Sequence, residues 1–177
     1  MNLFKRLIIF TIFISKQCTA QVNFKSNIGF KVGLNNSNVS GFETNGAETG
    51  FVGTEAYGGF FVDTKIGKNT SLENEFLYSF TDDYHFIEFP IHIKHNIFRK
   101  FYGFYGVRLD VATTSRMGYK FEPIGYTAEI GTQFFISKKS FIELRYSNGF
   151  TKQINDYQLD ILDGKRNTLR FGVGVKF

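Results

Sequence analysis

The chain has 177 residues, enough for one domain, with 21 basic and 16 acidic residues and a formal net charge of +5. Lys5, Arg6 and Lys16 lie in the first twenty positions, and without them 18 basic residues face 16 acidic ones. The remaining basic residues are scattered, with no run longer than a pair, so no nucleic-acid partner is expected. A content of 23 Phe, 9 Tyr and 18 Gly with only 2 Pro favours β-strands.

The first twenty residues predict a cleaved signal peptide. Lys5 and Arg6 precede an apolar run from Leu7 to Ile14, and Cys18 to Ala20 supplies small residues for a cleavage site. The apolar run is too short to cross a bilayer. We therefore expect residues 1–20 to be a signal peptide and residues 21–177 to form one β-barrel domain without cysteine.

Eight segments then alternate apolar and polar residues with a period of two, as β-strands do. In the first of them, Ile28, Phe30 and Val32 alternate with Gly29 and Lys31. No acidic or basic residue falls on the apolar set of any segment. The segments lie at residues 27–34, 55–62, 72–80, 87–94, 105–111, 125–134, 142–147 and 169–177.

The connections between these segments alternate in length. Short links are expected at residues 63–69, 96–100 and 137–140, and long loops at Asn35–Gly50, Thr113–Glu122 and Asn148–Arg166; the link at 81–84 is shorter than this rule requires. Short turns on one side and long loops on the other are typical of an outer-membrane barrel with periplasmic termini. The sequence therefore predicts an all-β fold, an eight-stranded antiparallel up-and-down transmembrane β-barrel of a Gram-negative outer membrane.

Alternation alone does not decide which face points inward, because a soluble lipocalin-like barrel would bury the apolar set. The interior of an eight-stranded barrel is only wide enough for side chains to fill. The apolar set is bulky, whereas the polar set contains many glycines, so we expect the bulky set to face outer-membrane lipid.

The polar set would then place a charged network in the lumen. Acidic and basic residues nearly balance there, which predicts a plugged interior held by ion pairs. A proton or ion path through the same residues is the alternative. The expected network comprises Lys31, Glu55, Glu73, Glu75, Glu88, His92, Lys94, Arg108, Asp110, Glu129, Glu143, Arg145, Arg170 and Lys176.

The end of the chain predicts a partner. Phe171, Val173, Val175 and Phe177 place an aromatic residue at the C-terminus on the lipid face of the last strand. This resembles the C-terminal signal by which the barrel-assembly machinery accepts its substrates, and the resemblance implies that machinery as a partner.

Two segments resemble the PorT-like family of small outer-membrane β-barrels. Residues 87–91 (Ile-Glu-Phe-Pro-Ile) are similar to the family's "L/I-E-I-P-L" strand, and residues 29–35 are similar to its opening "G-x-K-x-G-x-N" strand. The resemblance implies the fold and location, and a role in protein secretion as one further possibility. Because Pro90 removes a ladder donor inside a closed barrel, we expect a bulge or local break there, on the lumen side.

Candidate chemistry is sparse, and no catalytic, metal or cofactor site is expected. Ser79, His85 and the pair Asp82-Asp83 could form a hydrolytic set, but Ser79 and His85 should point in opposite directions. His92 is one histidine where a metal needs several ligands. In the last loop, Asp156, Asp160, Asp163 and Gly164 miss the calcium-loop spacing.

The leading hypothesis is thus a non-enzymatic barrel that acts through its loops as a structural, adhesive or assembly component with a surface or secretion-system protein as partner. The alternatives are a PorT-like secretion accessory, a narrow channel and a lipid-modifying or proteolytic barrel enzyme.

Overall fold

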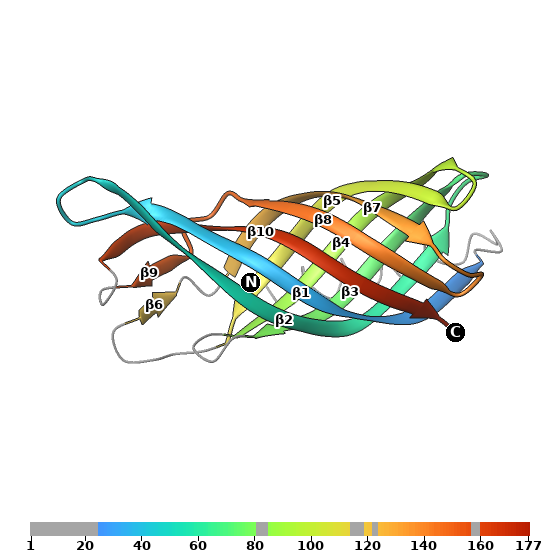
Figure 1. The fold of residues 1–177 in the computed structure, drawn as a ribbon, viewed down its shortest axis with the longest axis horizontal. Helices are drawn as coiled ribbons and strands as arrows, with labels where there is room; N and C mark the ends of the chain where they lie inside the picture. Colours follow the sequence, from blue (N-terminus) through green and yellow to red (C-terminus); the bar gives the residue numbers. More distant parts are fainter. Residues whose placement is uncertain (1–24, 81–84, 114–118, 122–123, 157–159) are drawn as a thin grey trace, which may run out of the picture.

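The computed structural model describes residues 25–80, 85–113, 119–121, 124–156 and 160–177. In this part of the chain, eight long antiparallel strands form a closed barrel (Figure 1). Each strand pairs with its neighbours, and β1 pairs with β10 to close the ring, which confirms the predicted fold. The signal peptide expected at residues 1–20 lies outside the described residues. The barrel strands are β1 (Ser26–Phe42), β2 (Glu48–Lys65), β3 (Thr70–Phe80), β4 (His85–Phe98), β5 (Phe101–Ala112), β7 (Ile124–Phe135), β8 (Ser140–Gly149) and β10 (Ile161–Lys176).

Two short strands lie outside the eight-stranded ring. β9 (Ile154–Asp156) pairs with the first residues of β10, and β6 (Tyr119–Phe121) pairs with β9. They extend the β10 side of the barrel at the end where the long connections lie (Figure 1).

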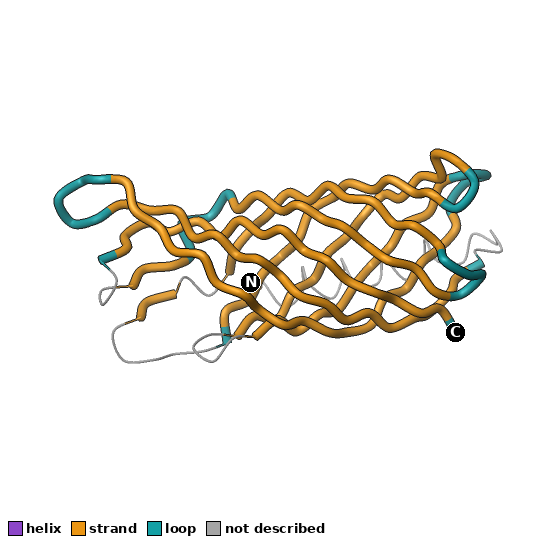
Figure 2. The backbone as a smooth tube through the Cα atoms, viewed as in Figure 1, coloured by secondary structure: helices purple, strands orange, loops and turns teal. Residues whose placement is uncertain are grey.

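The two ends of the barrel differ. Tight turns at residues 66–69, 99–100 and 136–139 gather at one end, which we call the turn end (Figure 2). Lys25 and Phe177 are at this end too, because the Lys65 amide donates to the Lys25 carbonyl and the Phe177 amide to the Ile28 carbonyl. We call the opposite end, where the β1–β2 hairpin protrudes, the loop end.

The structure corrects two of the predicted loop boundaries. The loop expected at Asn35–Gly50 is mostly strand, since β1 runs to Phe42 and β2 begins at Glu48. The loop expected at Asn148–Arg166 contains β9 and the first residues of β10. The cause is that the inward-facing alternation continues past the apolar part of each strand, with Ser37 and Val39 still buried. Thr113–Glu122 falls largely outside the described residues.

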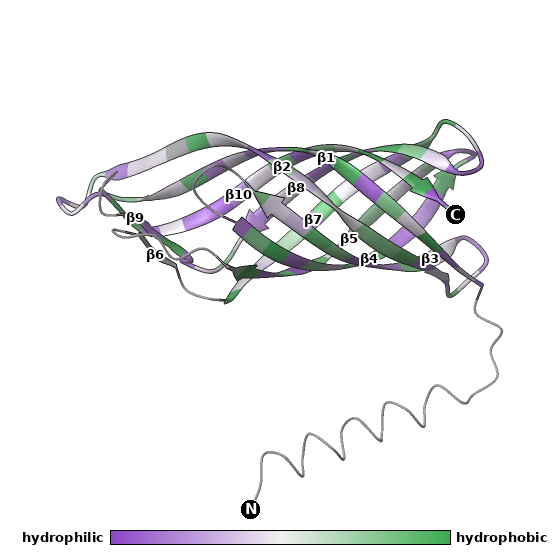
Figure 3. Cartoon of the chain, turned by 90° about the horizontal axis from the view of Figure 1, so that it is seen from below, coloured by the Kyte–Doolittle hydropathy of each residue, from purple (hydrophilic) through white to green (hydrophobic). Residues whose placement is uncertain are grey.

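The outer surface of the barrel is apolar around its middle (Figure 3). Leu34, Phe60 and Ile130 are 57–62% exposed, while the neighbouring positions on the same strands are covered inside the barrel. This inverts the arrangement of a soluble protein and matches a transmembrane barrel. The bulky set therefore faces outward as predicted, and the soluble lipocalin-like alternative is wrong. No helix among the described residues is long and apolar enough to cross a membrane.

Pro90 fits the ladder without a bulge. On the β5 side, pairing runs regularly from Glu88 with Asp110 to His92 with Gly106. On the β3 side the paired residues pass directly from Leu77–Glu88 to Asn74–Ile91 without a change of register. The bulge is therefore absent, and of the two predicted outcomes the local break is the one that the structure shows. The ladder is interrupted on the β3 side only, because proline has no amide hydrogen to donate, and Pro90 itself is buried on the lumen side.

Candidate functional site: the filled lumen

The structure places the expected charged residues inside the barrel. All of them are at most 5% exposed, except Lys176, which is half-buried at the turn end. The strands that supply them alternate strictly, so every second side chain of each strand reaches the same interior.

Lys31 is the central cation in the part of the lumen nearer the turn end. Its ammonium nitrogen lies 3.1 Å from Glu73, 2.7 Å from Glu75 and 2.8 Å from Glu143, each a carboxylate oxygen. Lys94 donates to the second oxygen of Glu73 at 2.5 Å. Two lysines and three glutamates from four different strands are thus joined in one cluster.

Arg145 is the central cation in the middle of the lumen. Its guanidinium contacts Glu75 at 2.8 Å, Glu129 at 3.1 Å and Glu143 at 2.6 Å. Glu129 in turn accepts from Arg108 at 2.8 Å and lies 2.7 Å from the Nε2 atom of His92. Since burying an unpaired charge costs several kcal/mol, such mutual pairing is what allows these groups to stay inside.

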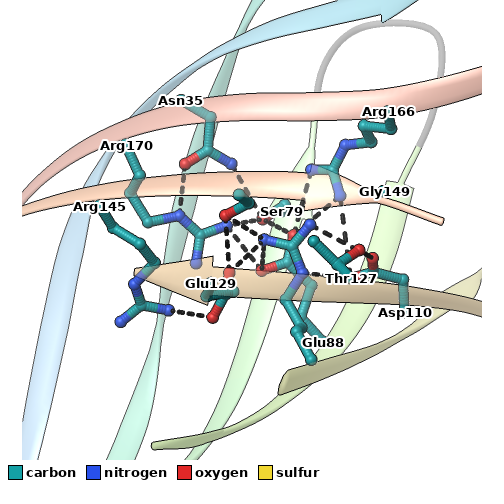
Figure 4. Close-up of polar contacts among 12 residues, drawn as sticks. Asn35, Ser79, Glu88, Asp110, Thr127, Glu129, Arg145, Gly149, Arg166 and Arg170 are labelled. Carbon is teal, nitrogen blue, oxygen red and sulfur yellow. Dashed lines mark hydrogen bonds and ion pairs between the residues drawn. The ribbon is translucent and has the colours of Figure 1, made fainter. Parts of the chain in front are cut away.

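Glu88 is the central carboxylate in the part of the lumen nearer the loop end (Figure 4). Its carboxylate accepts from Ser79 at 2.8 Å, from Arg170 at 2.6 Å and from Arg166 at 3.1 Å. Arg166 also donates to Glu55 from two of its nitrogens, forming a bidentate contact of the kind that arginine makes with carboxylates.

Two of these charges were missed at the sequence level. Arg166 is 2% exposed, and Asp63, which is 5% exposed, lies 3.0 Å from the ammonium of Lys94. Both fell in expected loops. A signal was present, because Asp63 continues the parity of Glu55 on β2, and Arg166 continues the parity of Arg170 on β10.

Apolar layers close the lumen on both sides of the charges. At the turn end, Phe61, Phe135 and Phe141 pack together with Tyr102 against them. At the loop end the corresponding layer consists of Val39, Phe86, Ile154 and Ile161. Apart from Lys176 at the turn end, the charged network is therefore enclosed along the barrel axis as well as around it.

Aromatic rings in the lumen occupy the space that glycines leave. A Cβ atom added to Gly172 would lie 1.9 Å from the Tyr57 hydroxyl, and one added to Gly174 would lie 2.3 Å from the Phe141 ring. The guanidinium of Arg170 stacks 4.1 Å from the centre of the Tyr57 ring, so the ring fills volume and faces a cation at once. The glycines of the inward-facing set therefore make room for these rings.

No catalytic set forms among the described residues. Ser79 is buried against Glu88, whereas His85 contacts the Tyr78 hydroxyl on the outer surface. The two candidate side chains are thus not brought together, as their parity predicted. Asp82 and Asp83 lie outside the described residues.

Metal chemistry is poorly supported as well. Ligand atoms of Glu73, Glu75 and His92 lie within 4.8 Å of one another. The ammonium of Lys31 already contacts both glutamates, so the protein supplies the cation itself. In the last loop, Asp160 accepts hydrogen bonds from Thr44.

The C-terminal residues lie on the outer face of β10. Phe171, Val173, Val175 and Phe177 are 44–72% exposed, in line with the rest of the apolar surface. Their recognition by the barrel-assembly machinery stays a prediction.

Comparison with known proteins finds low-identity similarity to solved barrels. No family model matches the chain, and no curated protein does. Neisserial surface protein A (NspA) has 12% identity and a TM-score of 0.46, over 84% of this chain and 97% of that chain. Ail, the attachment invasion locus protein of Yersinia pestis, has 16% identity and a TM-score of 0.48, over 86% and 99%. The outer membrane protein OprG of Pseudomonas aeruginosa has 12% identity and a TM-score of 0.45, over 87% and 97%.

Proposed function

We propose that this chain is a sealed, non-enzymatic barrel of a Gram-negative outer membrane that acts as an adhesive component through its loop end. The turn end, with both termini, faces the periplasm in this proposal. The observation that carries it is a continuous sheet that extends past the apolar surface on one side of the barrel.

The protruding sheet consists of β10, β1 and β2. Along the outer face of β1 the continuous apolar run ends at Leu34, and Asn36, Asn38 and Ser40 follow before the exposed Phe42 at the end of the strand. Beyond this point, pairing of β1 with β2 continues unbroken to Phe42 with Glu48. Pairing with β10 is regular to Ser40 with Lys165, and the register then shifts before Phe42 pairs with Leu162. A paired and therefore ordered polar sheet above the membrane is a suitable surface for binding another macromolecule.

The filled lumen supports a binding role over a channel. Eight strands leave little interior space, and here ion pairs and two apolar layers take that space. A conducting path would have to open these contacts, each of which costs free energy to break.

Orientation is tested with single cysteines, since the described residues contain none. Asn38→Cys places a thiol on the outer face of the protruding sheet, and Lys68→Cys places one in a turn at the opposite end. With a membrane-impermeant maleimide on intact cells, we expect labelling at position 38 and none at position 68 until the cells are broken. The reverse pattern would contradict the proposed orientation.

Function is tested by shortening the hairpin. Ser40 lies opposite Gly50, so a two-residue Asn-Gly turn can replace residues 41–49 and keep the remaining pairs. Expressed in a non-adherent host, the full chain is expected to confer attachment to surfaces and the shortened chain to lose it, with equal amounts of heat-modifiable barrel. Equal attachment by both chains would overturn the adhesive role. Loss of secreted proteins on deletion, with attachment unchanged, would instead select the PorT-like secretion role.

A further inference from the structure

The turn end carries a concentration of positive charge, of which the lumen network uses only Lys176. Asp63 is the only acidic residue of the described part of the chain that lines the cavities at this end, and residues 1–24 contain no acidic residue. By contrast, the loop end carries the exposed Glu48 and the half-buried Glu43, Asp160 and Asp163 beside the exposed Lys152 and Lys165. The basic residues of the turn end are Lys25, Lys65, Lys68, Arg99, Lys100, Lys138, Lys139 and Lys176.

Most of these cations have no anionic partner in the described structure. Asp63 is already shared by Lys94, at 3.0 Å, and Lys176. Lys100 donates to a backbone carbonyl and Arg99 stacks 5.1 Å from the Phe98 ring, neither of which neutralises charge. Like charges gathered at one end repel one another, so an anion placed among them would be stabilised.

The cations are arranged around two open cavities. One, of about 400 Å³, is lined by Lys65, Lys68 and Arg99, with Asp63 as its one acidic residue. A second, of about 580 Å³, is lined by Arg99 and Lys138. Lys176 lines both. Arg99 is held in place by its turn, where it has a left-handed φ of 45° and its carbonyl accepts a 2.9 Å bond from the Asn96 side chain.

A repeated pattern in the turns indicates what kind of anion fits. Each of the three turns sets an exposed isoleucine just before its bases: Ile66 before Lys68, Ile97 before Arg99 and Ile136 before Lys138. The isoleucines are 48–62% exposed. Apolar residues beside bases at the edge of an apolar surface match the boundary between acyl chains and phosphates of a bilayer. A soluble acidic peptide would not require the isoleucines.

We propose that the turn end binds the phosphate-bearing headgroups of anionic phospholipids, with one headgroup phosphate held among Lys65, Lys68 and Arg99. This inference rests on the proposed membrane location, and it adds a lipid class and a leaflet: the anionic lipid lies on the side of the membrane that the tight turns face. Binding there would also resist rotation of the barrel out of its orientation.

The test uses the full barrel in nanodiscs that contain equal amounts of phosphatidylglycerol and phosphatidylcholine, followed by native mass spectrometry of the released protein. The intact chain is expected to retain phosphatidylglycerol in preference to phosphatidylcholine. The triple variant Lys65→Gln, Lys68→Gln, Arg99→Gln should lose this preference by about tenfold or more. The matched control Lys152→Gln, Lys165→Gln removes cations from the loop end and should change nothing.

Inorganic phosphate at millimolar concentration separates headgroup recognition from acyl-chain binding. Reduced retention of phosphatidylglycerol in its presence is the expected result. Equal retention of both lipids by the intact chain, or an unchanged preference in the triple variant, would overturn the inference. Failure of the chain to enter nanodiscs would instead contradict the membrane location on which the proposed function rests.

Discussion

The charged residues of the lumen and those of the turn end differ in how they are paired and in how far they are exposed. In the lumen, Lys31 and Arg145 each contact three carboxylates and are shielded from solvent. At the turn end, Lys65 and Lys68 are exposed and have no acidic partner in the described structure. The pairing of a charge therefore tells more about its role than its presence does: paired charges maintain the barrel, and unpaired ones are free to bind.

Removing a central lumen charge is expected to have the largest effect. Arg145→Met leaves Glu75, Glu129 and Glu143 without their common partner, and the free energy of unfolding should fall by about 3–5 kcal/mol. Urea titration of the barrel in lipid vesicles, followed by heat-modifiable gel migration, measures this. Adding Glu143→Gln to Arg145→Met should restore part of the loss, and no recovery would mean that the charges act independently.

A glycine beside a lumen ring should have an intermediate effect. Gly172→Ala pushes a methyl group against the Tyr57 hydroxyl, and overpacking of this kind costs about 1–3 kcal/mol. Because that hydroxyl has no hydrogen-bond partner in the described structure, Tyr57→Phe should be tolerated and should relieve part of the cost. The same urea titration applies, with Gly58→Ala on the outer face as the control. If Tyr57→Phe left the Gly172→Ala loss unchanged, steric contact with the hydroxyl would not be its cause.

An exposed ion pair should matter least among the contacts. Lys152 lies 2.7 Å from Asp163, but their side chains are 55% and 49% exposed. Solvent screens such pairs, so Lys152→Ala should change the free energy of unfolding by at most about 1 kcal/mol. A loss as large as that of Arg145→Met would remove the distinction between the two regions.

The turn-end variant extends the comparison to stability. Lys65→Gln, Lys68→Gln, Arg99→Gln removes three charges that support no ion pair in the described structure, so stability should change by no more than about 0.5 kcal/mol. The titration is carried out in phosphatidylcholine alone, so that lipid headgroup charge does not contribute. A large destabilisation would assign these residues to the scaffold.

Much of the scaffold could be predicted from the sequence, because strand alternation is a local property. In the segments that contain Ile28 and Val173, alternation shows which residues share a face. The limited volume of the interior then indicates which face points out. The strand extensions could not be predicted from the apolar set, because that set ends before them, although Ser37 and Val39 keep the inward parity.

The contacts inside the lumen could not be predicted in the same way. Glu88 and Arg170 are 82 positions apart and lie on strands that are not neighbours, so only the stagger and closure of the barrel bring them together. The rings of Phe61 and Phe141 share the inward parity with the charges, but alternation alone does not show that they pack against Gly29 and Gly174 of other strands.

Conductance across a planar bilayer tests most directly whether the lumen is sealed. Protein that has been shown by gel migration to be folded is added to the bilayer, and its insertion is verified by recovery from the membrane. A sealed lumen predicts no current steps above those of the bare bilayer. Regular, sustained steps from the folded wild-type barrel would contradict it.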